Sequence, residues 1–226
     1  MQTLKKCFVV FACIVFLHAN PSSAATAPKS SSAPVEQIRA YISSAWDSLT
    51  RSLTDCNTVV DTKLSATSVL YLPADVAEPA PVHELENKCN VQVRHLPAAI
   101  HRLGEIDPGK IDPAGLLYLE NRYVVPGGRF NEMYGWDSYF IILGLIDDGR
   151  LDLARGMVEN FFFEIENYGA VLNANRTYYL TRSQPPFLSS MVMAIYQAQR
   201  KAGHDDRQWL ARAYDSIVRD HAMWTS

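Results

Sequence analysis

Charged and aromatic side chains are concentrated in a glycine-containing segment at positions 126–139, PGGRFNEMYGWDSY. This segment includes Arg129, Glu132, Trp136 and Asp137. Aromatic rings cover the C–H face of a sugar ring, while guanidinium and carboxylate groups hydrogen-bond to its hydroxyls. The same residues also suit an Arg–Asp ion pair buried between helices, so their chemistry alone leaves both interpretations open.

A second polar segment, NANRTYYLTRSQPP, occupies positions 173–186. It contains Asn173, Arg176, Arg182 and Gln184. Burying two arginines without partners is costly, and this segment has no acidic residue of its own. A ligand rich in hydroxyl groups, or a carboxylate from elsewhere in the chain, would satisfy these guanidinium groups.

Helical patterns follow both polar segments and predict the scaffold that positions them. Two stretches, YFIILGLI and FLSSMVMAIYQA, are apolar around most of the helix circumference, which is typical of buried helices. Each is followed by a stretch with apolar residues on one face only. The alternation predicts inner helices that are more buried than outer ones, the inner at about 137–147 and 186–202 and the outer at about 150–168 and 205–223.

These helices predict a layered α/α arrangement in which short links place both polar segments at the same end of the molecule. Ahead of them, helical spacing of apolar residues predicts a surface helix over 35–53. Prolines break the following region, 54–125, into short helices and extended pieces such as Val69–Leu72.

Both polar segments resemble those of the trehalases, glycoside hydrolase family 37. The segment at 126–139 is similar to the first signature of that family, and YYLTRSQPPF at 178–187 to the block that follows it. ENFFFEIENYG at 159–169 resembles the stretch that joins them. The resemblance covers about residues 118–200, and the form VLNANRTYYL is more similar to the neutral trehalase branch.

The resemblance implies an enzyme that hydrolyses α,α-trehalose to glucose with inversion. It implies an all-α fold, here an incomplete (α/α)6 toroid with an irregular N-terminal region. It also implies that the sugar is contacted by Arg129, Trp136, Asp137, Asn173 and Arg182, with Glu132, Arg176 and Gln184 as supporting candidates. No metal and no cofactor are implied.

An inverting glycosidase needs a carboxylic acid and a carboxylate base that lie roughly 6.5–9.5 Å apart. In the family both come from later segments, and the acidic residues after Pro186 resemble neither: Asp205, Asp206, Asp215 and Asp220. We therefore expect a truncated trehalase without its catalytic residues, inactive alone and completed, in one reading, by a second polypeptide. The alternatives are a non-catalytic or vestigial sugar-binding protein and a different α/α-toroid glycosidase.

The N-terminus has the pattern of a secretory signal. Lys5 and Lys6 precede the apolar run Cys7–Leu17, and small residues follow at Ser22–Ala24. We expect a secreted or periplasmic protein with three parts, namely a signal peptide at 1–24, a flexible leader at 25–34 and the toroid portion at 35–226.

The whole chain has 226 residues, of which 48% are hydrophobic, and a formal net charge of -3. This charge does not favour nucleic acid or an anionic membrane surface, and no stretch reaches the ~20 apolar residues of a membrane span. The expected partner is trehalose or a similar glucose disaccharide. Cys56 and Cys89 remain after signal cleavage, and the sequence leaves open whether they form a disulfide or stay as free thiols.

Overall fold

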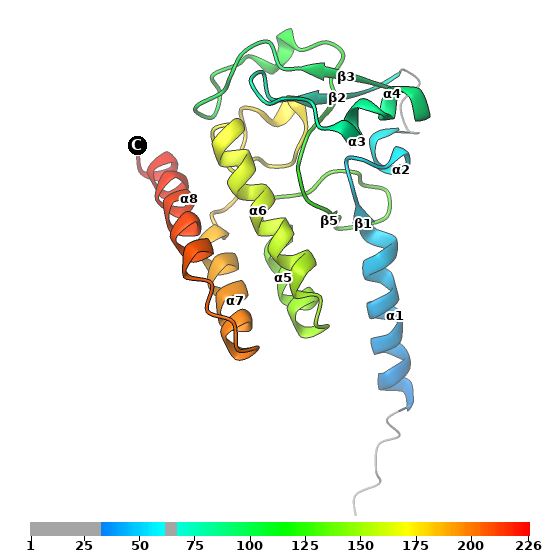
Figure 1. Cartoon of the computed structure of the whole chain (residues 1–226), viewed down its shortest axis with the longest axis vertical. Coiled ribbons are helices and arrows are strands. Elements are labelled where there is room, and N and C mark those ends of the chain that lie inside the picture. The colour runs from blue at the N-terminus through cyan, green and yellow to red at the C-terminus, as the bar shows by residue number, and fades with distance from the viewer. Residues whose placement is uncertain (1–32, 62–66) are drawn as a thin grey trace, which may run out of the picture.

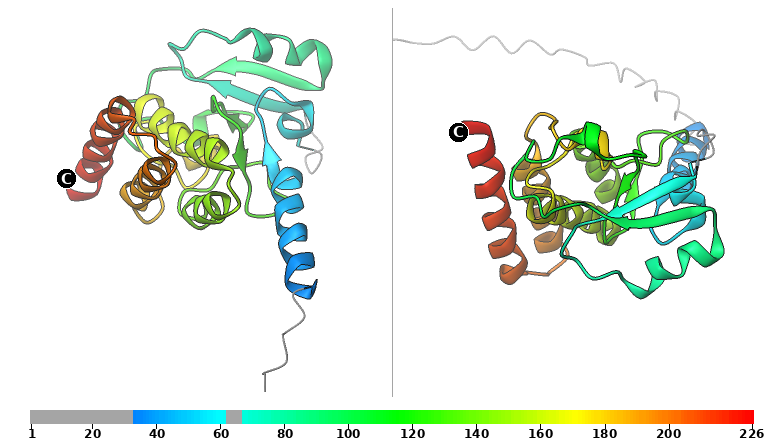
Figure 2. Two further views of the ribbon diagram at one scale, coloured as in Figure 1. Left: turned by 60° about the horizontal axis from the view of Figure 1, so that its bottom comes forward. Right: turned by 90° about the horizontal axis from the view of Figure 1, so that it is seen from above.

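The computed structural model describes residues 33–61 and 67–226, and Figure 1 shows their arrangement. Four C-terminal helices form one side of the molecule, and a small sheet lies across one end of them. Both views in Figure 2 place the last helix and the first helix at opposite edges. The expected signal peptide, and the expected leader up to residue 32, lie outside the described residues.

The N-terminal region consists of one long helix followed by short elements. Their bounds are α1 (Ala33–Leu49), β1 (Thr50–Arg51), α2 (Cys56–Val59), β2 (Ser68–Leu72), α3 (Ala80–His83), α4 (Leu85–Lys88), β3 (Val91–His95), a 3-10 turn (Pro108–Lys110), β4 (Leu116–Leu117) and β5 (Tyr123–Val124). The extended piece expected at Val69–Leu72 is confirmed as β2.

Strand β2 is the centre of a parallel three-stranded sheet with the order β3-β2-β4. Ser68 pairs with Val91 on one side, and Leu70 pairs with Leu116 on the other. All five residues of β2 are buried, which agrees with its continuous apolar sequence, because a central parallel strand is covered on both faces. This sheet is the main feature of the irregular N-terminal region.

The C-terminal half contains the four predicted helices. They are α5 (Asp137–Asp147), α6 (Leu151–Asn167), α7 (Leu188–Lys201) and α8 (Arg207–Thr225), with a 3-10 turn (Thr177–Tyr179) between α6 and α7. Helix α6 packs against α5, α7 and α8, and also against β5. Short turns join α5 to α6 and α7 to α8, so α5 and α7 begin at the same end of the layer, as expected.

The predicted order of burial is confirmed for α7 and α8 but wrong for α5 and α6. Helix α7 buries five of its 14 residues, whereas α8 buries three of 19. Ten of the 17 residues of α6 are buried, whereas α5 buries only Ser138, Ile142 and Leu145. Phe140 and Leu143 of α5 remain 57% and 40% exposed. The reason is position, because α6 packs against α5, α7, α8 and β5, while α5 packs mainly against α6 and α7, with Trp46 of α1 close to Gly144.

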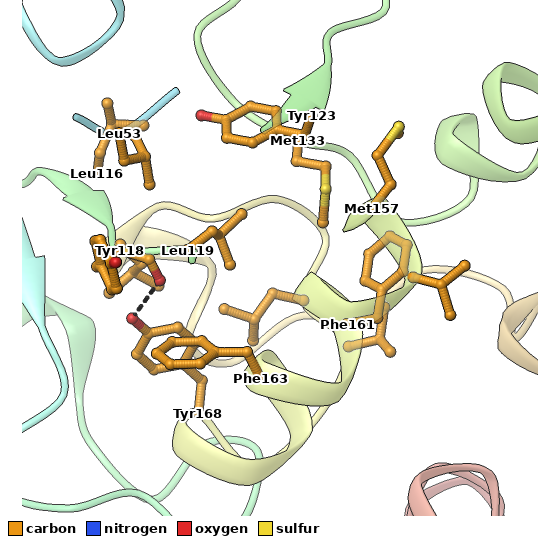
Figure 3. Packing of buried hydrophobic residues seen from close by; sticks show 14 of the residues in the cluster. Leu53, Leu116, Tyr118, Leu119, Tyr123, Met133, Met157, Phe161, Phe163 and Tyr168 are labelled. Atoms are coloured by element: carbon orange, nitrogen blue, oxygen red, sulfur yellow. Dashed lines mark hydrogen bonds between the residues drawn. The ribbon is translucent and has the colours of Figure 1, made fainter. Parts of the chain in front are cut away.

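Aromatic side chains connect α6 to the segments ahead of it. Figure 3 shows the Tyr168 hydroxyl directed at the backbone of Tyr118, whose carbonyl oxygen accepts its hydrogen bond over 2.8 Å. The rings of Tyr118 and Phe163 meet edge to face with their centroids 5.8 Å apart. These contacts fix the end of α6, from which the second polar segment departs.

A disulfide joins Cys56 at the start of α2 to Cys89 at the end of α4, with the two Cα atoms 5.7 Å apart. The structure thereby decides between the bridged and free alternatives that the sequence left open. The bridge closes a loop over a sequence separation of 33 residues, which includes β2.

Candidate functional site

Backbone hydrogen bonds join the two polar segments into one unit. Tyr134 and Ala174 form an antiparallel bridge. The Gly135 N–H donates to the Asn173 carbonyl over 3.2 Å, and the Asn173 N–H donates to the Arg182 carbonyl over 2.8 Å. Asn173 therefore lies between the segment that starts α5 and the segment that leads into α7. We call this arrangement the junction.

Gly135 lies against the second segment with no room for a side chain. A Cβ atom at this position would lie 3.0 Å from the Leu172 carbonyl oxygen and 3.1 Å from Gln184 Oε1. Gln184 Oε1 also accepts a hydrogen bond from the Trp136 N–H over 2.8 Å. Glycine thus permits the junction, and the Gln184 side chain holds the backbone of Trp136 in place.

All five predicted sugar contacts are accessible to solvent. Arg129, Trp136 and Arg182 are exposed, while Asp137 and Asn173 are partly buried. Four of them belong to the junction, since Asp137 follows Trp136 directly as the first residue of α5. Backbone hydrogen bonds therefore place these four residues in one junction formed from two segments.

Arg129 lies in a tight turn before the junction, in which the Phe130 N–H donates to the Gly127 carbonyl. Its guanidinium carbon is 5.4 Å from the centre of the Phe130 ring, within the range of a cation–π contact. Arg129 lines a hollow of about 590 Å³ together with Arg51 and Asn57 from the N-terminal region. It is thus the one predicted contact whose surroundings come mainly from outside the two polar segments.

Four aromatic rings surround the start of α5. Tyr139 stacks on Phe187 with ring centroids 4.9 Å apart, and Trp136 lies 6.3 Å from Phe187. Phe140 completes the cluster, with its centroid 6.1 Å from that of Trp136. Trp136 is 42% exposed, so the junction presents an aromatic surface beside the polar groups of Asp137.

Two of the supporting candidates are buried in an ion-pair network instead. The Arg176 guanidinium contacts Glu132 over 2.7 Å and Asp61 over 2.6 Å, and all three side chains are at most 6% exposed. Burial acts to lower the pKa of Arg176, but the nearby carboxylates raise it overall. The alternative of a carboxylate from elsewhere in the chain is therefore correct for Arg176, and this residue links both polar segments to the end of α2.

Three of the acidic residues after α7 have structural roles or are buried. Asp206 caps the start of α8 by accepting from the Trp209 N–H, and Asp205 pairs with Arg207. Asp220 is 7% exposed on α8, and burial raises its pKa. Within the described residues, His, Cys, Asp and Glu side chains form no group of three that could hold a metal ion.

Sequence reasoning missed two buried carboxyl groups next to these segments, Asp61 and Glu164. Glu164 Oε2 accepts from the Leu172 N–H over 3.0 Å, and burial raises the pKa of Glu164 to about 8. A signal for Glu164 was present, since it interrupts the apolar face of α6 that includes Phe161. Asp61 lies in irregular chain beyond α2, where no periodic pattern marks it.

Comparison with known proteins gives matches that all name trehalases. The family model described as Trehalase matches residues 20–226. The cytosolic neutral trehalase of Kluyveromyces lactis is 38% identical over 85% of this chain and 29% of its own length. That of Saccharomyces cerevisiae is 36% identical over 85% of this chain and 29% of its own length. This chain thus spans less than a third of the length of these curated relatives.

Among solved structures, a neutral trehalase from Saccharomyces cerevisiae matches with a TM-score of 0.69 and 34% sequence identity. The match covers 82% of this chain and 39% of that one. It confirms the expected fold class, an incomplete (α/α)6 toroid that is mostly helical. The small parallel sheet belongs to the irregular N-terminal region.

The expectation of a secreted or periplasmic protein is contradicted by these relatives. Those of Kluyveromyces lactis, Saccharomyces cerevisiae and Neurospora crassa are named cytosolic neutral trehalases. A periplasmic trehalase, from Xanthomonas campestris, aligns with only 49% of this chain. A short apolar run after two lysines was too weak a signal to decide the compartment. None of the helices that the structure describes is long and apolar enough to span a membrane.

Proposed function

This chain belongs to the trehalase family, and from that premise we propose that it supplies sugar-binding groups for the hydrolysis of α,α-trehalose to glucose with inversion. The observation that carries the proposal is the junction, in which the backbone of Asn173 is hydrogen-bonded to Gly135 of the first polar segment and to Arg182 of its own segment. The relatives named as trehalases support this substrate.

The side chains at the junction match the chemistry of a glucose unit. The exposed ring of Trp136 offers an apolar face to the C–H surface of the sugar. Asp137, Asn173 and Arg182 offer an acceptor, an amide and a charged donor to adjacent hydroxyls. Arg129, beside its own hollow, is assigned to the same sugar through the family resemblance.

The proposal assigns neither the general acid nor the general base to these segments. An inverting mechanism needs two carboxyl groups on opposite sides of the scissile bond. Glu132 is buried and paired with Arg176, so it is unsuited to exchange protons with a sugar. Asp137 remains as a binding group.

The test is trehalose binding by the purified chain, measured by titration calorimetry and by glucose release. We expect binding without useful turnover, since each missing acid or base typically contributes ~10²–10⁴-fold to the rate. Arg182→Ala should abolish binding while the variant stays folded, because Arg182 is exposed. Asp215→Asn, on the exposed side of α8, is the matched control.

Two results would contradict the proposal. Equal trehalose affinity for Arg182→Ala and the unchanged chain would remove the junction from the sugar site. Robust glucose release by a monomeric chain would show that catalytic carboxyl groups are present, and Asp137 would be the first to re-examine.

A further inference from the structure

A buried carboxyl group lies directly behind the junction and has no role in the proposed sugar contacts. Glu164 is 0% exposed, and its Oε2 accepts the hydrogen bond of the Leu172 N–H over 3.0 Å. Its Oε1 atom is also buried and has no hydrogen-bond partner among the described residues. Leu172 immediately precedes Asn173, so this contact holds the backbone at the point where it enters the junction.

We propose that Glu164 is a positioning residue for the sugar site, and that its buried carboxyl group holds the Leu172–Asn173 backbone in the binding geometry. The proposal rests on the proposed function in one respect, namely that Asn173 contacts the sugar. Glu164 itself acts through the backbone and does not touch the ligand.

The surroundings favour the neutral form of this carboxyl. Burial is the largest cause of its raised pKa, about 8, and the Leu172 N–H opposes the rise. Tyr168, which directly follows α6, donates its hydroxyl to the Tyr118 carbonyl. The elements packed around α6 carry these titratable and charged residues: Asp137, Tyr139 and Asp147 on α5, Tyr123 on β5, Tyr196, Arg200 and Lys201 on α7, and Arg207, Arg212, Tyr214, Asp215, Arg219, Asp220 and His221 on α8.

Arg219 is the cation of α8 that reaches this part of α6, and it donates to the Ile165 carbonyl over 2.9 Å. That bond goes to the backbone beside Glu164. A charged Glu164 would leave its Oε1 atom without a compensating partner among the described residues, and an isolated buried carboxylate is costly. Its Oε2 atom would still accept from the Leu172 N–H, which favours the charged form.

The first test follows the backbone and needs no sugar. In nuclear magnetic resonance spectra of the 15N-labelled chain, the Leu172 and Asn173 amide signals should shift with an inflection near pH 8. Glu164→Gln keeps an acceptor oxygen but cannot ionise, so the inflection should disappear. Glu166→Gln changes an exposed glutamate two positions further along α6 and should retain it. An inflection that persists in Glu164→Gln, or is missing from the unchanged chain, overturns the proposal.

The second test measures trehalose affinity at pH 7 for Glu164→Gln and Glu164→Leu. Glu164→Gln keeps an acceptor for the Leu172 N–H and should bind like the unchanged chain, whereas Glu164→Leu removes that acceptor and should weaken binding about tenfold. Circular dichroism checks that Glu164→Leu stays folded. Equal affinity for Glu164→Leu and the unchanged chain overturns the positioning role. If the chain binds no trehalose at pH 7 while the amide inflection is present, the proposed function fails and the backbone role of Glu164 stands.

Discussion

Arg176 and Arg182 lie six positions apart in one polar segment, yet they have opposite environments. Arg176 is buried between Glu132 and Asp61, whereas Arg182 is exposed. Removing one partner of a buried ion pair leaves uncompensated charge in a medium that solvates it poorly. Arg176 therefore holds the fold around the site, and Arg182 is free to serve a ligand.

We predict that Arg176→Ala lowers the free energy of unfolding by ~3–5 kcal/mol, because it removes the buried cation that contacts the Glu132 and Asp61 carboxylates. Arg182→Ala should change the same quantity by no more than ~0.5 kcal/mol, as is usual for surface substitutions. Urea denaturation followed by circular dichroism measures both. Similar losses in the two variants would show that the buried network does not distinguish these arginines.

At the scale of elements, the end of α6 decides how the second polar segment departs. Gly169 follows the helix with a φ of 82°, in the left-handed region that favours glycine. A Cβ atom there would lie only 2.5 Å from the backbone of Arg102, so both conformation and space require glycine. Gly149, between α5 and α6, has a φ of 73° but nothing within 4 Å of its Cβ position.

Replacement of each glycine by alanine separates these two effects. Gly149→Ala should cost only the ~1–2 kcal/mol of a left-handed residue with a side chain. Gly169→Ala should cost a further ~1–3 kcal/mol, since the surrounding backbone must shift to avoid the clash. Thermal unfolding of both variants under one set of conditions provides the comparison. Equal midpoints of thermal unfolding for the two variants would mean that the backbone at Arg102 can move aside without loss of stability.

At the scale of the whole molecule, the disulfide connects α2 with α4 around the small sheet. It closes a loop over 33 residues within the N-terminal region, which has only short elements after α1. A cross-link stabilises such a region chiefly by restricting the unfolded chain. The bridge also borders the hollow that Arg129 lines, so it supports one predicted contact.

We predict that the double substitution Cys56→Ser and Cys89→Ser lowers the free energy of unfolding by ~3–4 kcal/mol, the loss of chain-entropy restriction expected for this loop length. Urea denaturation with and without a reducing agent measures the effect. The unchanged chain should lose similar stability on reduction, while the double variant should not respond. Full stability of the double variant would show that the sheet holds α2 and α4 without the bridge.

Local patterns in the sequence determined much of this protein. The 3.6-residue periodicity predicted α5 to α8 within a few residues, and a continuous apolar run predicted β2, because both signals depend only on neighbours along the chain. The two polar segments likewise carried the family resemblance and four of the residues that meet at the junction. Arg129 was predicted from the same segment, but the sequence did not predict that it lines a hollow with Arg51 and Asn57.

Tertiary structure decided which apolar faces are covered and which charges are paired. Helix α6 is more buried than the more apolar α5 because burial depends on elements distant in sequence, which periodicity does not describe. The pairing of Arg176 with Asp61 spans 115 positions, and the Glu164 carboxyl meets the Leu172 N–H only through the turn after α6. Such contacts join residues that are distant in sequence and meet only when the chain folds. Only the folded structure therefore shows which charged residue forms a buried ion pair, which holds the backbone, and which stays exposed to a ligand.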